Sequence, residues 1–445
     1  MEKTFKVILG AGESGVGAAL LAKKQGFNVF VSELGKISNS YKEILENNNI
    51  VFEEGKHSEK VILMAEEVIK SPGIPEKSPI ITRIREEGIR IISEIEFAAR
   101  YTKAKLIGIT GTNGKTTTTL LTYHLMKSAG LKVGIAGNVG KSFAESVSKD
   151  QFDWYVLEVS SFQLDDCYEF TPNIAILLNI TPDHLDRYNK DMQNYIDAKF
   201  RLMQNMEESQ VLLYNGEDKI IAKQMKEDEP FATLKPINSK WYDGKNIVIP
   251  AGTLAKTQKE AIKFDNLPIP GRHNQLNACA AITAAMLAGV TAEQVREGLK
   301  TFTNTAHRLE KVVEINGVVC INDSKATNVD AVYYALGSYE QPIIWIAGGT
   351  DKGNDYKQIE ELVGKNVKAL VCMGKDNTKL YKFFKGKVPA IADTTDIKSA
   401  VKRAFSYAEK GDIILLSPAC ASFDLFKNYE DRGEQFKAIC LELAK

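Results

Sequence analysis

The chain has 445 residues, of which 44% are hydrophobic and 26% are charged, and its 57 Lys and Arg residues balance 57 Asp and Glu residues. This composition is typical of a folded globular protein and excludes a disordered or low-complexity chain. Because the net charge is zero and no long apolar run occurs, we expect neither a nucleic-acid partner nor a membrane-spanning helix.

At about 150 residues a domain, the length predicts about three domains. The amino-terminal segment MEKTFKVILGAGESG has too short an apolar run for a signal peptide. The six Cys residues include no CxxC pair, which favours reduced thiols and a cytoplasmic enzyme. We expect this enzyme to be a monomer.

The dominant pattern along the chain is a short apolar run, a turn that contains Gly or Asn, and a helical stretch. Apolar runs without alternation are typical of strands buried on both faces of a parallel sheet, so the pattern predicts an α/β fold. The predicted strands are 5–10, 28–32, 67–71, 105–110, 132–137, 154–159, 174–179, 343–349, 368–374 and 412–417. The predicted helices between them include 116–129, 272–288 and 397–409.

Two boundaries divide the chain into the expected domains. A helical stretch at 92–105 leads into a new strand, which puts the first boundary near residue 97. The second boundary lies near residue 302, after the helical stretch 291–300. The expected domains are residues 1–97, 98–302 and 303–445.

Two further segments differ in how much they predict. Asn316 and Gly317 stand between two apolar runs, which predicts a β-hairpin. Residues 216–266 are charged and irregular, and we predict no element there.

The first predicted strand runs into the segment GAGESG (10–15). Gly10, Gly12 and Gly15 fit the pattern G-x-G-x-x-G, and Glu33 lies at the end of the next strand. By itself this pattern indicates a dinucleotide site, a site for another nucleotide diphosphate, or only a tight turn between a strand and a helix.

The most specific single motif is IGITGTNGKTTTT (107–119). A strand ends, a turn of Gly, Thr and Asn follows, and Lys115 and Thr116 begin a helix. Backbone N–H groups of such a turn bind phosphate, the Lys can reach the β- and γ-phosphates, and the Thr hydroxyl can hold Mg²⁺. The general pattern G-x-x-x-x-G-K-[ST] requires Gly where this chain has Ile109. An ordinary turn therefore stays as the alternative.

Polar side chains follow two further strands of the central domain. Glu158 closes the strand 154–159, and His184 follows the strand 174–179. Because ligands bind outside the carboxyl ends of parallel strands, we expect both side chains at the edge that holds the phosphate loop. A carboxylate and an imidazole there suggest metal ligands, with an ordinary loop role for His184 as the alternative. From the residues alone, Lys199 is interpreted as a surface lysine of a helix.

The C-terminal domain contains a dense polar segment, INDSKATN (321–328), after an apolar run. Its acid, hydroxyl, lysine and amide suit the phosphate or ribose of a nucleotide, and a capped turn is the alternative. His307 lies in a second polar cluster, AHRLE.

Several of these segments together resemble one family, the Mur ligases. They are GTNGKTT (111–117), LEVSSFQL (157–164), NITPDHLDRY (179–188), DAKFR (197–201), GRHNQLNA (271–278), HRLE (307–310), INDSKATN (321–328) and LLSPACASFDLFKNYEDRGEQF (415–436). The resemblance runs in order through all three expected domains, and the last segment is similar to that of the members that add D-glutamate. Several motifs in one order are far more specific than any one of them.

The resemblance implies three α/β domains: a Rossmann-like N-terminal domain for a UDP-linked substrate, a central P-loop-type ATPase domain, and a Rossmann-like C-terminal domain for an amino acid. It implies ATP-dependent amide formation in peptidoglycan precursor synthesis. The substrates implied are UDP-N-acetylmuramoyl-L-alanine and D-glutamate, joined through an acyl phosphate. The cofactors implied are ATP, two Mg²⁺ ions and a carbamate on Lys199.

The resemblance also implies roles for individual residues. The expected catalytic residues are Lys115, Glu158, His184 and Lys199. The expected metal ligands are Thr116, Glu158, His184 and Lys199 as its carbamate. The expected ATP-binding residues are Gly111, Thr112, Asn113, Gly114, Lys115, Thr116, Thr117, Asn274, His307, Arg308, Asp323 and Lys325. The residues expected to bind the UDP-linked substrate are Gly12, Glu13, Ser14, Glu33, Gly73, Asn138 and His184. The residues expected to bind D-glutamate are Thr327, Lys352, Ser422, Phe423 and Tyr429.

Other functions stay open at this point. A dinucleotide-dependent oxidoreductase would account for GAGESG but would leave the GTNGKTT loop unexplained. A non-catalytic nucleotide-binding switch would use that loop without ligation. Within the enzymes, a ligase for a different amino acid or a folylpolyglutamate synthase-like ligase would share the central loop.

Overall fold

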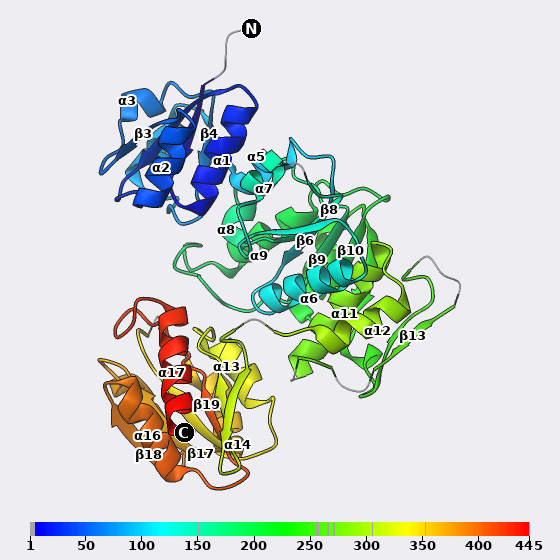
Figure 1. The fold of residues 1–445 in the computed structure, drawn as a ribbon. Helices are drawn as coiled ribbons and strands as arrows, with labels where there is room; N and C mark the ends of the chain where they lie inside the picture. The colour runs from blue at the N-terminus through cyan, green and yellow to red at the C-terminus, as the bar shows by residue number, and fades with distance from the viewer. Residues whose placement is uncertain are drawn as a thin grey trace. The chain divides into compact units, whose positions relative to one another are not determined.

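A computed structural model describes most of the chain and contains three α/β sheets and one small two-stranded sheet (Figure 1). The predicted fold class is therefore confirmed. The described residues are 5–149, 151–254, 258–264, 267–269, 272–304, 306–351 and 353–444, without the side chains of 272 and 273. The chain divides into two compact units, residues 1–265 with 276–301, and residues 266–275 with 302–445. The N-terminal and central sheets belong to the first unit.

The N-terminal sheet has five parallel strands in the order β3-β2-β1-β4-β5. Its elements are β1 (Phe5–Leu9), α1 (Glu13–Lys24), β2 (Asn28–Glu33), α2 (Asn39–Asn47), β3 (Val51–Glu54), α3 (Glu59–Ile62), β4 (Glu67–Lys70), α4 (Pro79–Glu86), β5 (Arg90–Ser93) and α5 (Glu94–Ala99). Because β2, β1 and β4 are neighbours and parallel, the turns that follow them leave the sheet at one edge. Strands β3 and β5 were not predicted from the sequence.

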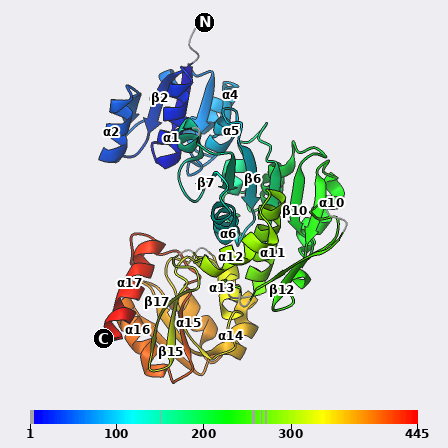
Figure 2. The same ribbon diagram turned by 45° about the vertical axis from the view of Figure 1, so that its right-hand side comes forward.

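The central sheet has six parallel strands in the order β11-β10-β9-β6-β8-β7. Its strands are β6 (Lys105–Thr110), β7 (Val133–Gly137), β8 (Trp154–Glu158), β9 (Ile174–Leu177), β10 (Val211–Asn215) and β11 (Thr233–Ile237). Its helices are α6 (Lys115–Ser128), α7 (Phe143–Lys149), α8 (Ser161–Leu164), α9 (Met192–Phe200), η1 (Arg201–Met203), α10 (Lys219–Asp228), α11 (Arg272–Leu287) and α12 (Ala292–Thr301). Strand β10 and helix α10 lie on the side of the sheet away from β7 (Figure 2).

The segment 216–266, in which no element was predicted, is partly regular. Besides α10 and β11 it holds η2 (Ser239–Trp241) and the antiparallel pair β12 (Asn246–Ile249) and β13 (Glu260–Lys263). Charged residues alternate with apolar ones in these short elements, so the apolar pattern is too weak to be recognised in the sequence.

The two sheets of the first unit share one continuous core, in which α1 packs against α7 (Figure 1). A Cβ atom at Gly17 would lie 1.9 Å from Oγ of Ser142, which shows how closely these helices approach. Polar contacts add to this packing. The Glu96 carboxylate accepts hydrogen bonds from the backbone N–H groups of residues 168, 169 and 170, and Lys70 pairs with Asp166 at 2.9 Å.

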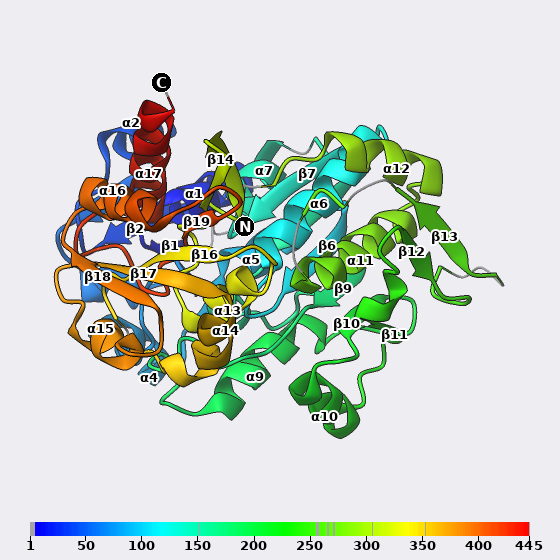
Figure 3. The same cartoon turned by 90° about the horizontal axis from the view of Figure 1, so that it is seen from below.

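The second unit is built on a six-stranded sheet in the order β14-β15-β19-β16-β17-β18, parallel except for β14. Its strands are β14 (Glu310–Ile315), β15 (Val318–Asn322), β16 (Ile343–Ala347), β17 (Val367–Met373), β18 (Ala390–Thr394) and β19 (Ile413–Leu416). Its helices are α13 (Val329–Leu336), η3 (Tyr356–Ile359), α14 (Glu360–Asn366), α15 (Thr378–Phe384), α16 (Ile397–Tyr407) and α17 (Tyr429–Leu443). Helices α16 and α17 cover one face, and α13, α14 and α15 cover the other (Figure 3).

The hairpin predicted in this unit is confirmed. Strands β14 and β15 pair antiparallel around Asn316 and Gly317, which have φ values of 52° and 80°. Two consecutive positive φ values are typical of the type I′ turn that such a pair favours. Among the helices of the described residues, none is long and apolar enough to cross a membrane.

Candidate active site

The turn after β6 has the geometry that a phosphate loop requires. Gly111 and Gly114 have φ values of +153° and +84°, and Gly114 is the N-cap of α6. A Cβ atom at Gly114 would lie 2.5 Å from Oδ1 of Asn277, so both the backbone and the neighbouring side chain favour glycine here. The helix begins at Lys115, and its N-terminal N–H groups and those of the turn provide a site suited to an anion.

A neighbouring loop holds this turn in shape. The backbone N–H of Asn113 donates to Oδ1 of Asn179 at 2.8 Å, and Nδ2 of Asn179 donates to the Asn113 carbonyl at 2.9 Å. The Thr112 hydroxyl donates to the Thr181 carbonyl and lies 3.2 Å from the Tyr195 hydroxyl. No role was predicted for Asn179 or Tyr195 from the sequence. The position of Asn179 just after a strand that neighbours β6 is a signal that would have found it.

Two lysines meet at the same turn. Nζ of Lys115 donates to the carbonyl oxygens of Gly111 and Thr112 at 2.7 and 2.8 Å. Nζ of Lys199 donates to the same Gly111 oxygen at 2.9 Å and lies 4.4 Å from the centre of the Tyr195 ring.

Lys199 is buried, with 1% of its surface exposed, so its interpretation as a surface lysine was wrong. The residues around it in α9 contain no long apolar run, so the sequence of the helix does not reveal which face is buried. Burial lowers the pKa of the Lys199 ammonium well below its ordinary value, and the charge of Lys115 lowers it further, against the opposing charges of Asp183 and Asp165. The lowered pKa favours the neutral amine more than in an ordinary lysine.

Glu158 ends β8 beside the phosphate loop and is almost fully buried, with 2% exposed. Its Oε1 accepts a hydrogen bond from Nδ2 of Asn138 at 2.8 Å, and the Asn138 backbone N–H donates to the Glu158 carbonyl at 2.8 Å. None of the described residues donates to Oε2, although this atom is buried. Asn138, which was expected to contact substrate, therefore also orients this carboxylate.

His184 lies in the loop between β9 and α9 with a positive φ of 53°. Its ring packs edge-on against Phe162, with 5.1 Å between ring centres, and 44% of the side chain is exposed. Within the described part of the chain, no three His, Cys, Asp or Glu side chains lie together so that they could hold a metal ion.

The donor set nevertheless suits Mg²⁺ bound together with a nucleotide. This ion is usually held by one or two carboxylates and by phosphate oxygens rather than by a complete protein cage. The buried Oε2 of Glu158, which lacks a donor among the described residues, is a suitable ligand atom. Thr116 lies in the first turn of α6 and is also almost buried.

The expected UDP-substrate residues of the N-terminal sheet follow three neighbouring strands. The turn after β1 is tight, because a Cβ atom at Gly15 would lie 1.9 Å from the Gly10 carbonyl oxygen. The Glu33 carboxylate, at the end of β2, accepts hydrogen bonds from the N–H groups of Ala11 and Gly35 at 2.8 and 2.7 Å. Gly12 and Glu13 are exposed at this edge, Ser14 is half-buried, and Gly73 is exposed in the turn after β4.

In the second unit, the loops after β15, β19 and β16 meet at one edge of the sheet. The N–H of Asp323 donates to the Leu416 carbonyl at 2.8 Å, and the N–H of Ala419 donates to the Ala326 carbonyl at 3.0 Å. The N–H of Thr350 donates to the Ala421 carbonyl at 2.8 Å. These bonds bring the SKATN and SPACASFD segments together.

The residues expected to contact ATP from this unit lie around Asp323. Its buried carboxylate accepts from the Ser417 hydroxyl at 2.9 Å and from the Leu309 N–H at 3.2 Å, and burial raises its pKa to about 6. His307 is buried beside it, and burial lowers its pKa. Nζ of Lys325 lies 5.6 Å from the centre of the Tyr429 ring. The structure thus places Asp323, His307 and Lys325 in neighbouring loops.

The other two residues expected to contact ATP differ in burial. Arg308 is half-buried, and Asn274 is buried in the first turn of α11.

The residues expected to bind D-glutamate are only partly described by the structure. Ser422 is buried and Thr327 is half-buried, whereas 72% of Phe423 is exposed. Tyr429 begins α17. Lys352 lies outside the described residues.

Arg432 was not predicted to matter, yet it ties the two loops together. Arg432 is fully buried. Its guanidinium donates to the Ser324 carbonyl at 2.8 Å and to the Cys420 carbonyl at 3.2 Å. An arginine in a mixed helix such as NYEDRGEQF gives no sequence signal of burial, which is why it was missed.

Comparisons with known proteins cover all three sheets. Three family profiles match the chain: "MurD N-terminal domain" over residues 7–80, "Mur ligase middle domain" over 109–285, and "Mur ligase, glutamate ligase domain" over 307–420. The UDP-N-acetylmuramoylalanine--D-glutamate ligase of Bacteroides fragilis is 51% identical over 440 residues, which are 98% of this chain and 99% of the relative. The enzyme of the same name from Salinibacter ruber is 37% identical over 99% of this chain and 98% of its own length.

Solved structures share the fold at lower identity. MurF from Acinetobacter baumannii matches with a TM-score of 0.61 at 14% identity, covering 98% of this chain and 93% of its own. A pseudomurein peptide ligase type C from Methanothermus fervidus matches with a TM-score of 0.59 at 20% identity, covering 99% of each chain.

Proposed function

Because the chain belongs to the Mur ligase family, we propose that it joins D-glutamate to UDP-N-acetylmuramoyl-L-alanine with ATP, in peptidoglycan precursor synthesis. The observation that carries this function is the 51% identity, over nearly the whole of both chains, to a UDP-N-acetylmuramoylalanine--D-glutamate ligase. The match to the MurD N-terminal domain favours a UDP-linked substrate over a folylpolyglutamate synthase-like one. Because the chain belongs to this family, we no longer interpret GAGESG as the dinucleotide site of an oxidoreductase.

The reaction forms one amide bond and breaks one phosphoanhydride bond. The carboxylate of the alanyl substrate attacks the γ-phosphorus of ATP and releases ADP, which gives an acyl phosphate. The neutral amine of D-glutamate then attacks the acyl carbon. The resulting tetrahedral intermediate loses inorganic phosphate, and the amine proton passes to solvent or to a nearby base.

Lys115 and the turn that precedes it are the proposed phosphate grip. The Lys115 ammonium donates to two backbone carbonyls of its own turn. Phosphate oxygens are anionic and accept stronger hydrogen bonds than carbonyls do, so the ammonium transfers to them when ATP binds. There it stabilises the charge that gathers on the γ-phosphoryl oxygens in the transition state.

We propose that Lys199 is carbamylated. Its buried position and the nearby charge of Lys115 favour the neutral amine, and only a neutral amine adds to CO₂. The ammonium first loses one proton, and addition of the neutral amine to CO₂ forms an N–C bond and releases a second proton, so that a buried cation is replaced by an anion. That anion would lie opposite the Lys115 ammonium, since both amines now contact the Gly111 oxygen.

The residues that would hold Mg²⁺ are Glu158, Thr116, His184 and the carbamate of Lys199. Bound Mg²⁺ neutralises phosphate charge and polarises the γ-phosphorus. Asn138 keeps the Glu158 carboxylate in place by the bond to Oε1, which leaves Oε2 for a ligand. A carbamate would supply a second anionic ligand at this edge, besides Glu158.

The remaining assignments follow the three sheets. Residues 1–97 are proposed to bind the UDP-linked substrate, 98–302 to bind ATP, and 303–445 to bind D-glutamate. We place the enzyme in the cytoplasm, because its six cysteines are free and buried and ATP is a cytoplasmic substrate, and we propose separately that it is a monomer.

Phosphate release tests this function. The chain is incubated with Mg-ATP, UDP-N-acetylmuramoyl-L-alanine and one of D-glutamate, L-glutamate, L-lysine or diaminopimelate. Sustained release is expected only with D-glutamate, and only when the UDP-linked substrate is present. Equal release with L-glutamate would contradict the choice of amino acid, and release that needs no UDP-linked substrate would contradict the ligase assignment.

A further inference from the structure

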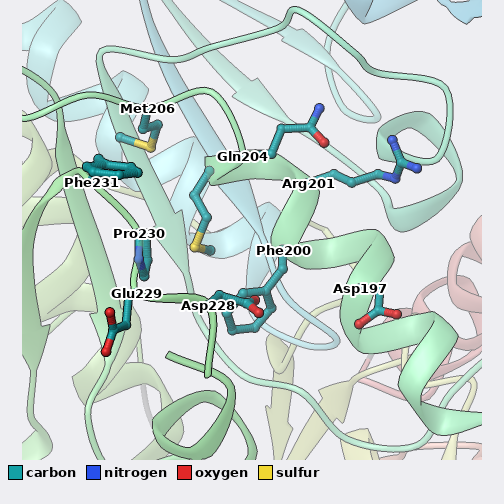
Figure 4. Close-up of a pocket in the computed structure, with 10 residues that line it drawn as sticks. Asp197, Phe200, Arg201, Gln204, Met206, Asp228, Glu229, Pro230 and Phe231 are labelled. Carbon is teal, nitrogen blue, oxygen red and sulfur yellow. The ribbon is translucent and has the colours of Figure 1, made fainter. Parts of the chain in front are cut away.

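A cavity of about 450 Å³ lies in the first unit, outside the residues assigned to catalysis (Figure 4). Its lining comes from the end of α9 with η1 and from the segment that joins α10 to β11. Figure 4 shows Phe231, Pro230 and Glu229 on one side and residues of α9 on the other. Ligand pockets in proteins have volumes of about 300–1,000 Å³, so the cavity is large enough for a small organic molecule.

The floor of the cavity is apolar and adaptable. Phe200, Met203 and Met206 line it and are buried, with 6%, 4% and 3% exposed. Phe231 stands at its margin with 81% exposed, the largest exposure among the large hydrophobic residues of the described chain. Methionine sulfur packs favourably against aromatic rings and adapts to their shape. An aromatic or branched aliphatic group would cover Phe231 and fill the space above the methionines.

The rim of the cavity is acidic. Asp197, Asp228 and Glu229 line it, and all three are exposed. The amide of Gln193 donates to Asp197 and that of Gln224 to Asp228, and both donors are neutral.

The lining contains one cation, Arg201, which is engaged elsewhere. Its Nη1 donates to the Cys167 carbonyl at 3.2 Å, and its guanidinium carbon lies 5.8 Å from the centre of the Tyr168 ring. Figure 4 shows the guanidinium extending away from Glu229. The rim therefore favours a ligand with a positive charge.

We propose that this cavity is a second ligand site, which takes a small organic cation with an aromatic or branched aliphatic body. The apolar body lies on Phe200 and the methionines under Phe231, and the ammonium group lies at the acidic rim. Size, apolar floor and acidic rim agree on this one class of ligand. An anionic or neutral molecule of the same shape would lack the attraction to the rim.

The site has a direct route to the catalytic residues through α9. Asp197, Phe200 and Arg201 have the spacing of residues on one face of a helix, and all three line the cavity. Lys199 lies two positions from Asp197, so it points to a different face, and there it donates to the Gly111 carbonyl. A ligand that displaces α9 therefore moves Lys199. This part of the proposal rests on the proposed function.

Binding is tested with the full chain carrying ¹³C-methyl methionine. The probe is 4-phenylbutylammonium, and its matched controls are 4-phenylbutyrate and 4-phenylbutanol. Saturable shifts of the Met203 and Met206 methyl signals are expected with the ammonium probe. The anionic probe should bind at least about fivefold more weakly than the ammonium probe, because a charge near a surface rim has a Coulomb energy of this order. Equal binding of the anion, or no shift at these methionines, would overturn the proposal.

Variants locate the site. Phe231→Ala should weaken the probe roughly tenfold, since it removes an aromatic contact, and Asp228→Asn with Glu229→Gln should weaken it by about fivefold. Met64→Ala is the matched control, because Met64 is also exposed, at 73%, but lies in the N-terminal sheet domain. Equal affinity in the Phe231 and Met64 variants, with otherwise native methyl spectra, would overturn the assignment.

Phosphate release measured with the probe present tests the route through α9. A saturable change in kcat, lost in Phe231→Ala, is expected. Binding of the probe without any change in kcat would contradict the coupling through α9 but not the ligand site itself. A chain that binds the probe but never releases phosphate with D-glutamate would instead overturn the proposed function, so the two failures are distinguishable.

Discussion

Lys115 and Lys199 donate hydrogen bonds to one and the same acceptor, the carbonyl oxygen of Gly111, at 2.7 and 2.9 Å. Two ammonium groups at a single neutral oxygen repel each other, and one of them, Lys199, is buried. The pair is therefore relieved when one lysine loses its charge, and the pKa of Lys199 is the one that burial and Lys115 together lower. This relationship connects the geometry of the phosphate loop to the proposed carbamate.

The first prediction concerns the carbamate itself. In ¹³C-bicarbonate the native chain should acquire one carbamate carbon that is absent from Lys199→Met. Lys199→Ala should lose most ligase activity and recover part of it with acetate or formate, which supply a carboxylate in the vacated space. Free amine in the native protein under bicarbonate, together with an active variant, would remove the carbamate from the mechanism.

The second prediction concerns stability without CO₂. Because the folded pKa of Lys199 is depressed, the unfolded chain binds the proton more tightly, and the free energy of unfolding rises with pH up to the ordinary lysine pKa. Lys199→Met should therefore be more stable than the native chain at pH 7, and this advantage should shrink as pH rises toward 10. Denaturant unfolding at several pH values measures it. A difference in the free energy of unfolding that does not change with pH would contradict the lowered pKa of Lys199.

The third prediction concerns the orientation of Glu158. Asn138→Ala removes the donor to Oε1 and frees the carboxylate to rotate. A hydrogen bond to a charged group contributes about 1.5–3 kcal/mol, so the Mg²⁺ concentration for half-maximal activity should rise by roughly 10- to 150-fold. Asn246→Ala, in the β12–β13 hairpin, is the matched control. An unchanged Mg²⁺ requirement in folded Asn138→Ala would contradict this positioning role.

The fourth prediction concerns the junction of the N-terminal and central sheets. Oε1 of the buried Glu94 accepts from the Ser142 hydroxyl at 2.7 Å and from the Ala144 N–H at 2.6 Å, and burial raises its pKa to about 7. The folded state thus holds a proton that the unfolded state releases near pH 4.5. The resulting stability is complete below that pH and is lost as pH rises through about 7.

Glu94→Gln keeps an acceptor oxygen and removes the titration. At pH 8 the variant should be more stable than the native chain by up to about 3 kcal/mol, and at pH 5 the difference should nearly vanish. Thermal or denaturant unfolding at the two pH values measures this. A native advantage that grows with pH would contradict the raised pKa.

The fifth prediction concerns D-glutamate. Lys352, expected from the family resemblance to pair one substrate carboxylate, lies outside the described residues. Lys352→Ala should raise the KM for D-glutamate by roughly 10- to 150-fold, the range for a lost charge-assisted hydrogen bond, and should change the KM for ATP much less. Steady-state kinetics with both substrates varied measures this. An unchanged KM for D-glutamate would refute the assignment.

The sequence predicted the elements that carry chemistry better than the contacts among them. The GTNGKTT turn follows a strongly apolar strand, and Gly-Lys-Thr at the start of a helix is typical of phosphate-binding turns, so its place at the start of α6 was predictable. The burial of Lys199 was not, because it depends on contact with the turn at Gly111, which is distant in the sequence. The bond between Asn138 and Glu158 likewise depends on β7 lying beside β8.

Surface elements and buried cations were the hardest to predict. Strand β11 and the β12–β13 hairpin have short, mixed sequences whose structure is decided by their neighbours rather than by local preference. Arg432 is buried because two loops supply carbonyl acceptors for it, and no pattern in its own helix reports those loops.

The most direct test of the central claim follows one oxygen atom. UDP-N-acetylmuramoyl-L-alanine is labelled with ¹⁸O in the alanyl carboxylate and incubated with Mg-ATP, D-glutamate and the chain, and the inorganic phosphate is analysed by mass. If the carboxylate attacks the γ-phosphorus at the site formed by Lys115 and Glu158, each phosphate carries one ¹⁸O atom from the substrate. Phosphate without label, formed while the amide product accumulates, would contradict an acyl phosphate and with it this account of the site.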